Sequence, residues 1–128
     1  MIEHEKQQRT LDLVKAAVVS LDEHKAEDIC VLKVDAVTSL ADYFILATGT
    51  STTHVRALVD YVDADLSKRQ FQPLRTEGYQ TSLWTVLDYG TVVIHVFSEN
   101  TRTFYDLERL WKDAEPVSTA SFLEDDEA

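Results

Sequence analysis

The 128-residue sequence has one cysteine, three glycines, two prolines and no long apolar run. A single cysteine, Cys30, excludes an intrachain disulfide and a metal site built on a cysteine pair. No segment reaches the roughly 18 continuous apolar residues that a membrane helix requires. The first ten residues, MIEHEKQQRT, lack the apolar stretch of a signal peptide. We therefore expect a soluble, cytoplasmic protein with no membrane contact.

Basic residues are also scarce, since 12 lysines and arginines face 23 acids and give a formal net charge of −11. Four of the acids stand near the end of the sequence: Glu124, Asp125, Asp126 and Glu127. A strongly negative surface repels phosphate backbones, so we expect little direct RNA contact. The same charge favours a basic protein surface as the partner and speeds the encounter with it.

The hydrophobic fraction of 45% is sufficient for one packed core. Helical spacing of apolar residues predicts helices over residues 5–25, from Ser51 or Thr52 to about Gln70, and over 100–112. Strands are predicted at 29–34, 43–48, 83–88 and 91–97, with a short edge strand in PLRTEG, residues 73–78. The order αββαβββα predicts a single α/β (α+β) domain over residues 1–115, with a mixed sheet of about five strands and flanking helices. Residues 116–128 are predicted to form a flexible acidic tail.

One pattern superficially matches a nucleotidyltransferase, in which a small-residue turn precedes an Asp-x-Asp pair that binds magnesium. Here Gly49-Thr50-Ser51 precedes Asp63-Ala64-Asp65. The aspartates fall within a helical pattern, so their side chains lie about 200° apart around the helix axis and cannot converge on one ion. A lone glycine is also too little for a nucleotide-binding loop. We expect no metal, no cofactor and no catalytic residue, and we assign Gly49 and Ser51 to a turn and a helix cap.

His95 lies in the middle of a predicted strand, among valines, with no nucleophile or second metal ligand at a suitable spacing. A histidine in this setting usually has a structural role, in which a neighbouring polar group satisfies the ring. Cys30 is likewise interpreted as core packing.

The most informative stretch is the hairpin SLWTVLDYGTVVIHVF, residues 82–97. Because side chains alternate along a strand, Leu87 points to one face and Trp84 and Asp88 point to the other. Both faces therefore carry large apolar groups. Either helices cover both faces, or one face meets a partner, for which tryptophan and tyrosine are favoured anchors. The tight turn is completed by Gly90, which accepts a positive φ.

Three blocks, ADYFILATGTSTTHV, EGYQTSLWTVLDYGTVVIHVF and RTFYDLERLW, together resemble the ribosomal silencing factor family, also called Iojap, over about residues 10–112. The resemblance implies a nucleotidyltransferase-like fold without the catalytic carboxylates. It implies binding to the fourteenth protein of the large ribosomal subunit, which sterically blocks joining of the small subunit and represses translation under nutrient limitation. A homodimer is possible, because members often dimerise. An assembly adaptor for the large subunit and a nucleotidyltransferase are the two rival readings.

The resemblance also assigns roles to residues. The expected partner contacts are Trp84, Leu87, Asp88, Tyr89, Tyr105 and Glu108, and the expected structural residues are Gly49, Ser51, Gly90, His95 and Trp111. Asp88 either faces a basic residue of the partner or caps its own turn. Two positions depart from the family pattern: Thr53 stands where many relatives have arginine, and Thr91 stands where many have an acid.

Overall fold

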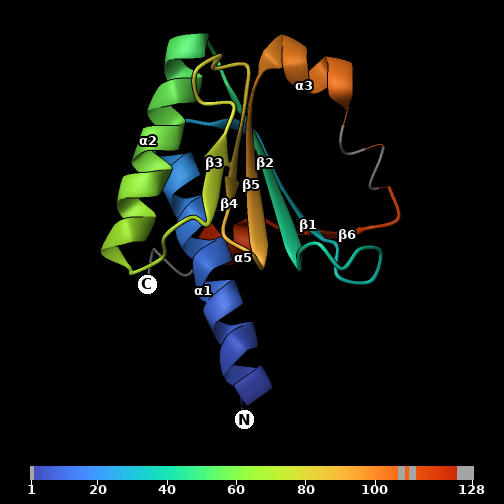
Figure 1. Cartoon of the computed structure of the whole chain (residues 1–128). Helices are drawn as coiled ribbons and strands as arrows, with labels where there is room; N and C mark the ends of the chain where they lie inside the picture. Colours follow the sequence, from blue (N-terminus) through green and yellow to red (C-terminus); the bar gives the residue numbers. More distant parts are fainter. Residues whose placement is uncertain (1, 107–108, 110–111, 124–128) are drawn as a thin grey trace.

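A computed structural model describes residues 2–106, 109 and 112–123. These residues form a six-stranded mixed sheet with helices packed on it (Figure 1). The elements are α1 (Ile2–Glu23), β1 (Glu27–Lys33), β2 (Tyr43–Gly49), α2 (Thr52–Lys68), β3 (Arg75–Glu77), β4 (Trp84–Asp88), β5 (Val92–Ser98), α3 (Glu99–Tyr105), β6 (Glu115–Val117) and α5 (Ala120–Leu123). The predicted α+β domain is confirmed, with β6 as a strand that the sequence pattern did not indicate.

The strand order in the sheet is β3-β4-β5-β2-β1-β6. β2 and β5 pair in parallel at the centre, and every other pair of neighbours is antiparallel. A parallel pair needs a long crossover connection, which here contains α2, β3 and β4. The result is a mixed sheet whose two central strands are buried on both faces.

The main core lies between α1, α2 and one face of the sheet (Figure 1). α1 contributes Val14, Val18 and Leu21, and α2 contributes Leu58 and Val62; all five are fully buried. Each such side chain stabilises the fold by about 1.5–3 kcal/mol relative to exposure in water. The helical period recognised in the sequence is therefore the period of this buried stripe.

A second, smaller cluster lies on the opposite face of the sheet. Its buried members include Leu32, Phe44, Leu46 and Phe97, and Trp84 packs against them while remaining half-buried. The sheet is thus apolar on both faces, as the hairpin sequence suggested.

The turn from β2 into α2 uses the two small residues expected there. A Cβ on Gly49 would lie 2.7 Å from Val55 Cγ2 and 2.8 Å from its backbone nitrogen, so only glycine allows this close approach of helix to strand. Ser51 is the N-cap, because its hydroxyl accepts a hydrogen bond from the His54 backbone N–H at 3.0 Å. Gly49 therefore lies at the close approach of strand and helix, and Ser51 caps the helix.

The last predicted helix, 100–112, is interrupted. α3 ends at Tyr105, and Asp106 adopts a left-handed conformation with φ 48° that closes the helix through its N–H to the Arg102 carbonyl. The prediction of one continuous helix was wrong for this reason. Residues 107–108 and 110–111 lie outside the described residues.

Residues 117–123 belong to the fold, although the sequence predicted that order ends at Pro116. β6 pairs with β1, placing Pro116 opposite Leu32 on an edge strand, where a missing N–H is tolerated. α5 follows and packs against α1, with Phe122 and Leu123 against the main core. Of the predicted tail, residues 124–128 lie outside the described part. Within the described part, none of the helices has the length and apolar character needed to span a bilayer.

Candidate functional site

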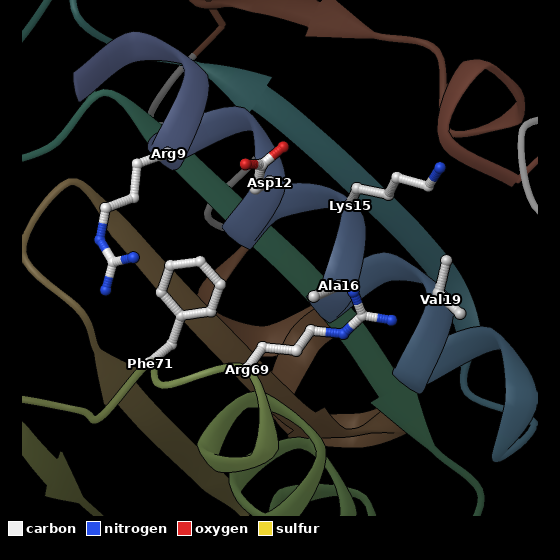
Figure 2. Close-up of a pocket in the computed structure, with 7 residues that line it drawn as sticks. All are labelled: Arg9, Asp12, Lys15, Ala16, Val19, Arg69 and Phe71. Carbon is white, nitrogen blue, oxygen red and sulfur yellow. The ribbon is translucent and has the colours of Figure 1, made fainter. Parts of the chain in front are cut away.

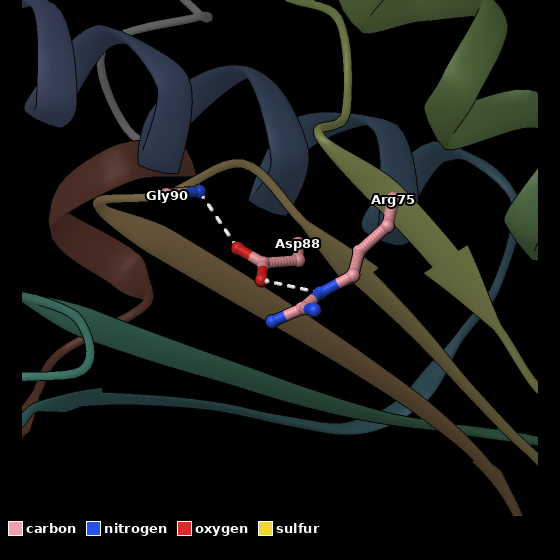
Figure 3. A network of polar contacts seen from close by, with 3 residues as sticks. All are labelled: Arg75, Asp88 and Gly90. Carbon is pink, nitrogen blue, oxygen red and sulfur yellow. Dashed lines mark hydrogen bonds and ion pairs between the residues drawn. The ribbon is translucent and has the colours of Figure 1, made fainter.

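The β4–β5 turn is held by Asp88. Its Oδ1 accepts a hydrogen bond from the Gly90 N–H at 2.8 Å, and its Oδ2 accepts one from Arg75 Nε at 3.2 Å (Figure 3). Gly90 has φ 88°, which explains the glycine at this position. Of the two roles considered for Asp88, the turn cap is the one these contacts make. The Arg75 side chain is 69% exposed, so the ion pair itself contributes at most about 1 kcal/mol.

The alternation of side chains along β4 separates the predicted contact residues into two groups. Leu87 is 1% exposed and Tyr89 is 9% exposed, and both belong to the core beneath the helices. Trp84, Val86 and Asp88 are half-buried on the other face of the sheet. The register places Arg75 and Glu77 of β3 beside Asp88 and Val86. We call these five residues the hairpin face.

Leu87 and Tyr89 therefore support the hairpin from beneath and do not belong to its exposed surface. The Tyr89 hydroxyl is buried and has no hydrogen-bond partner among the described residues. Burial raises the pKa of Tyr89 well above its ordinary value, and the negative charge of Asp63 raises it further. Tyr89 is therefore a neutral core residue at any physiological pH.

Trp84 is fixed in place by its neighbours on β5. Its indole Nε1–H donates a hydrogen bond to His95 Nδ1 at 3.1 Å. Its ring also stacks on Phe97, with centroids 5.2 Å apart. Because one end of the indole is anchored while part of its surface reaches water, the side chain is preorganised to contact a partner.

His95 is buried in the middle of β5 and contacts Trp84. It is 7% exposed, and its Nδ1 accepts from Trp84, so the ring proton of the neutral imidazole is assigned to Nε2. Nε2 is buried without a partner among the described residues. Burial lowers the pKa of His95 from 6.5 to about 4. The ring is neutral near pH 7 and orients Trp84.

The folded state should lose stability in acid because of His95. The unfolded chain binds a proton near pH 6.5 and the folded chain only near pH 4, so stability present above pH 6.5 is lost as the pH falls through this range. Between about pH 7 and 4.5 this group should lower the free energy of unfolding by about 2.5 kcal/mol. Urea unfolding at both pH values measures the change. His95→Gln, whose amide oxygen can still accept from Trp84, should reduce the decrease by this amount, and an equal decrease in both proteins would contradict the assignment.

The remaining predicted site residues lie near the end of the described chain. Tyr105 is the last residue of α3, and its side chain is not described. Glu108 and Trp111 lie outside the described residues. Their predicted roles, as contacts for Tyr105 and Glu108 and as a structural residue for Trp111, therefore stay predictions.

The two aspartates of the Asp-x-Asp pattern do not form a metal site. Both lie on α2, where Asp63 is exposed and Asp65 Oδ2 accepts a hydrogen bond from Ser20 Oγ at 2.7 Å. Across the described residues, no group of three or more histidine, cysteine or acidic side chains is placed to hold a metal ion.

Arg102 was not identified from the sequence, yet it occupies a notable position. Its Nη1 donates to the Asp28 carbonyl at 2.6 Å and to Thr48 Oγ1 at 2.9 Å, beside a cavity of about 310 Å³. Thr48 lies at the carboxyl end of β2, the edge where α/β sheets commonly bind ligands. The arginine therefore joins α3 to the sheet edge at this point. No local sequence signal marks it, because its partners are 54 and 74 residues away.

The fold and the hairpin face define a small α+β protein that presents a fixed, half-buried tryptophan on the second face of its sheet. A family model described as "Ribosomal silencing factor during starvation" matches residues 7–128. A ribosomal silencing factor of Bacillus subtilis is 34% identical over 110 residues, which are 86% of this chain and 92% of that protein. The chain belongs to the ribosomal silencing factor family, as its sequence blocks indicated.

Other relatives extend the comparison. A mouse protein named "Mitochondrial assembly of ribosomal large subunit protein 1" is 37% identical over 94 residues, which are 71% of this chain and 41% of that protein. A crystal structure of a Chromobacterium violaceum protein has a TM-score of 0.78 and 34% identity, covering 80% of this chain and 85% of that chain. A Bacillus halodurans structure has a TM-score of 0.75 and 30% identity, covering 84% and 98%. These similarities confirm the fold.

Proposed function

We propose that this protein binds the large ribosomal subunit through its fourteenth ribosomal protein and sterically prevents the small subunit from joining. Translation would thereby be repressed when nutrients are limiting. The observation that carries the proposal is the family match over residues 7–128, together with relatives named ribosomal silencing factors. This function needs occupancy of a surface and no chemical step.

The hairpin face is the part of the molecule proposed to make the contact. Trp84 supplies a large apolar surface that is already held by His95 and Phe97. Arg75, Glu77 and Asp88 lie further along the same face, towards the β4–β5 turn, so the hairpin face combines an apolar anchor with charged neighbours, as interfaces commonly do. The net charge of −11 would speed the approach to a basic ribosomal protein, so binding should weaken as salt increases.

A second candidate function is large-subunit assembly. It is favoured by the name of the mouse relative, which refers to mitochondrial assembly of the ribosomal large subunit. Both functions use a contact with the large subunit, and they differ in whether the target is the mature subunit or a precursor. Catalysis of nucleotidyl transfer is disfavoured by the divergent positions of Asp63 and Asp65 on α2.

Sedimentation of purified mature subunits tests the proposal. Small and large subunits are mixed with and without saturating protein, and joined ribosomes are separated from free subunits on a gradient. We expect the protein to migrate with the large subunit and the joined fraction to decrease strongly. Normal joining at saturation would reject the silencing function. Altered precursor subunits in cells lacking the protein, with unaffected joining in vitro, would support assembly instead.

A further inference from the structure

A groove on the helical layer, away from the hairpin face, concentrates the scarce basic residues of this protein. Its centre is a cavity of about 460 Å³ between α1 and the end of α2 (Figure 2). The lining residues are Arg9, Asp12, Lys15, Ala16, Val19, Arg69 and Phe71. Two adjoining hollows share parts of this wall and add Lys6 on one side and Lys68 on the other. We call the three joined hollows the basic groove.

The charge of the basic groove is opposite to that of the whole chain. The central cavity has three cationic side chains and one carboxylate, so its lining carries +2 in a protein of net charge −11. Five of the twelve basic residues line the three hollows, together with the three acids Asp12, Glu23 and Asp65, so the whole lining also carries +2. Asp12 already accepts a hydrogen bond from Gln8 Nε2, and Asp65 accepts one from Ser20. A localised positive potential of this kind attracts an anionic segment.

Contacts within the protein hold the walls of the basic groove in place. Arg9 Nη2 donates to the Gln70 carbonyl at 3.1 Å, and its guanidinium lies 4.5 Å above the centre of the Phe71 ring. Phe71 is buried at 6% exposure, so it gives this cation a fixed platform. In Figure 2, Arg69 extends from the end of α2 towards α1, near Ala16. These contacts join α1 to the end of α2, and little ordering is needed on binding.

We propose that the basic groove binds the acidic segment Glu124–Glu127 of the same chain. α5 packs against α1, and the four acids follow Leu123, the last residue of α5, directly. α1 is about 10 Å across and each extended residue spans about 3.4 Å, so in a segment that starts beside α1 the last acids, Asp126 and Glu127, can reach the groove. Their carboxylates complement the cations that line it.

The docked segment is held by its tether as much as by its charges. Exposed ion pairs are individually weak, but a short connection gives a high effective concentration, so docking is reversible and sensitive to salt. Occupying the groove covers cationic side chains of the helical layer and keeps phosphate backbones away from them. This inference stands apart from the proposed ribosomal function, because it concerns the free protein alone.

Zero-length carbodiimide cross-linking of the full chain tests the proposal. The reagent joins a carboxylate to a lysine amine in direct contact, and peptide mapping of the dilute monomer identifies the pairs. We expect links from Glu124–Glu127 to Lys15, Lys6 or Lys68, at least about five-fold above links to Lys25, an exposed lysine just after α1. About 1 M sodium chloride should abolish the difference.

Two arginine variants serve as a matched pair. Arg69→Gln removes a cation from the groove and should reduce the Lys15 links several-fold, whereas Arg75→Gln removes an exposed arginine on β3 and should leave them unchanged. Circular dichroism is used to check that both variants are folded. Equal links to Lys15 and Lys25 in low salt would overturn the proposal. So would links found only in cross-linked dimers and rising with protein concentration, because the groove would then receive a second copy.

Discussion

Replacing Trp84 by alanine should weaken binding to the large ribosomal subunit by at least about 30-fold, which corresponds to about 2 kcal/mol. The reason is that Trp84 is the largest apolar side chain of the hairpin face and is held ready by His95 and Phe97. Cosedimentation with purified large subunits over a range of protein concentrations measures the change. Undiminished binding would remove the hairpin face from the interface.

Two further variants separate contact from stability. Trp84→Phe keeps an aromatic ring against Phe97 and loses only the hydrogen bond to His95, so it should retain most of the binding. Tyr61→Ala removes an aromatic ring that is 48% exposed on α2 and stacked on His24, on the helical layer. If the contact is made by the hairpin face, Tyr61→Ala should bind as well as the unaltered protein. A loss for Tyr61→Ala equal to that for Trp84→Ala would place the interface elsewhere.

Replacing Gly78 by alanine should cost about 3 kcal/mol or more of unfolding free energy and should also displace the start of β4. Gly78 has φ 80°, and a Cβ there would lie 2.1 Å from the Trp84 carbonyl oxygen. The left-handed conformation alone costs a non-glycine residue about 1–2 kcal/mol. The contact adds to this, because the neighbouring atom is backbone and cannot rotate away. Urea unfolding and large-subunit binding should both be affected.

Gly90 provides the matched control, since it has nearly the same φ, 88°, but ample space. A Cβ on Gly90 would meet only Leu74 Cδ1, at 3.4 Å. Gly90→Ala should therefore show the conformational cost of about 1–2 kcal/mol without the clash. The difference between the two variants measures the contact with Trp84. Equal losses of unfolding free energy in Gly78→Ala and Gly90→Ala would show that the loop before β4 relieves the contact without cost.

Local patterns were sufficient to predict the elements that bury a regular stripe. Val55, Leu58 and Val62 indicated the period of α2, and Ser51 indicated its N-cap. The apolar run Val92–Phe97 predicted a strand covered on both faces, and β5 is that strand, flanked by β2 and β4. In each case the signal lies within a few neighbouring residues, which is why one sequence was enough.

Features that depend on distant partners could not be predicted in this way. β6 has only three residues, one of them a proline. It pairs Val117 with Val31, two residues that are far apart in the sequence. The left-handed Asp106 has no glycine to mark it. The alternation of side chains along β4 correctly placed Trp84 and Leu87 on opposite faces of the sheet. It did not indicate which of the two faces the helices cover. The basic groove joins Arg9 to Gln70, 61 positions apart, so no local motif reveals it.

The parallel pairing of β2 with β5 has a consequence for how the chain acquires its structure during synthesis. The two strands at the centre of the sheet are separated in the sequence by α2, β3 and β4. Tyr43 of β2 therefore cannot pair with Val92 until β5 has been synthesised. Contacts between such distant segments carry a large loop-closure cost and slow the search for the native state. A nascent chain that has exposed only β1, β2 and α2 still lacks its central neighbour. Stable tertiary structure should therefore appear late, after β5 has left the exit tunnel.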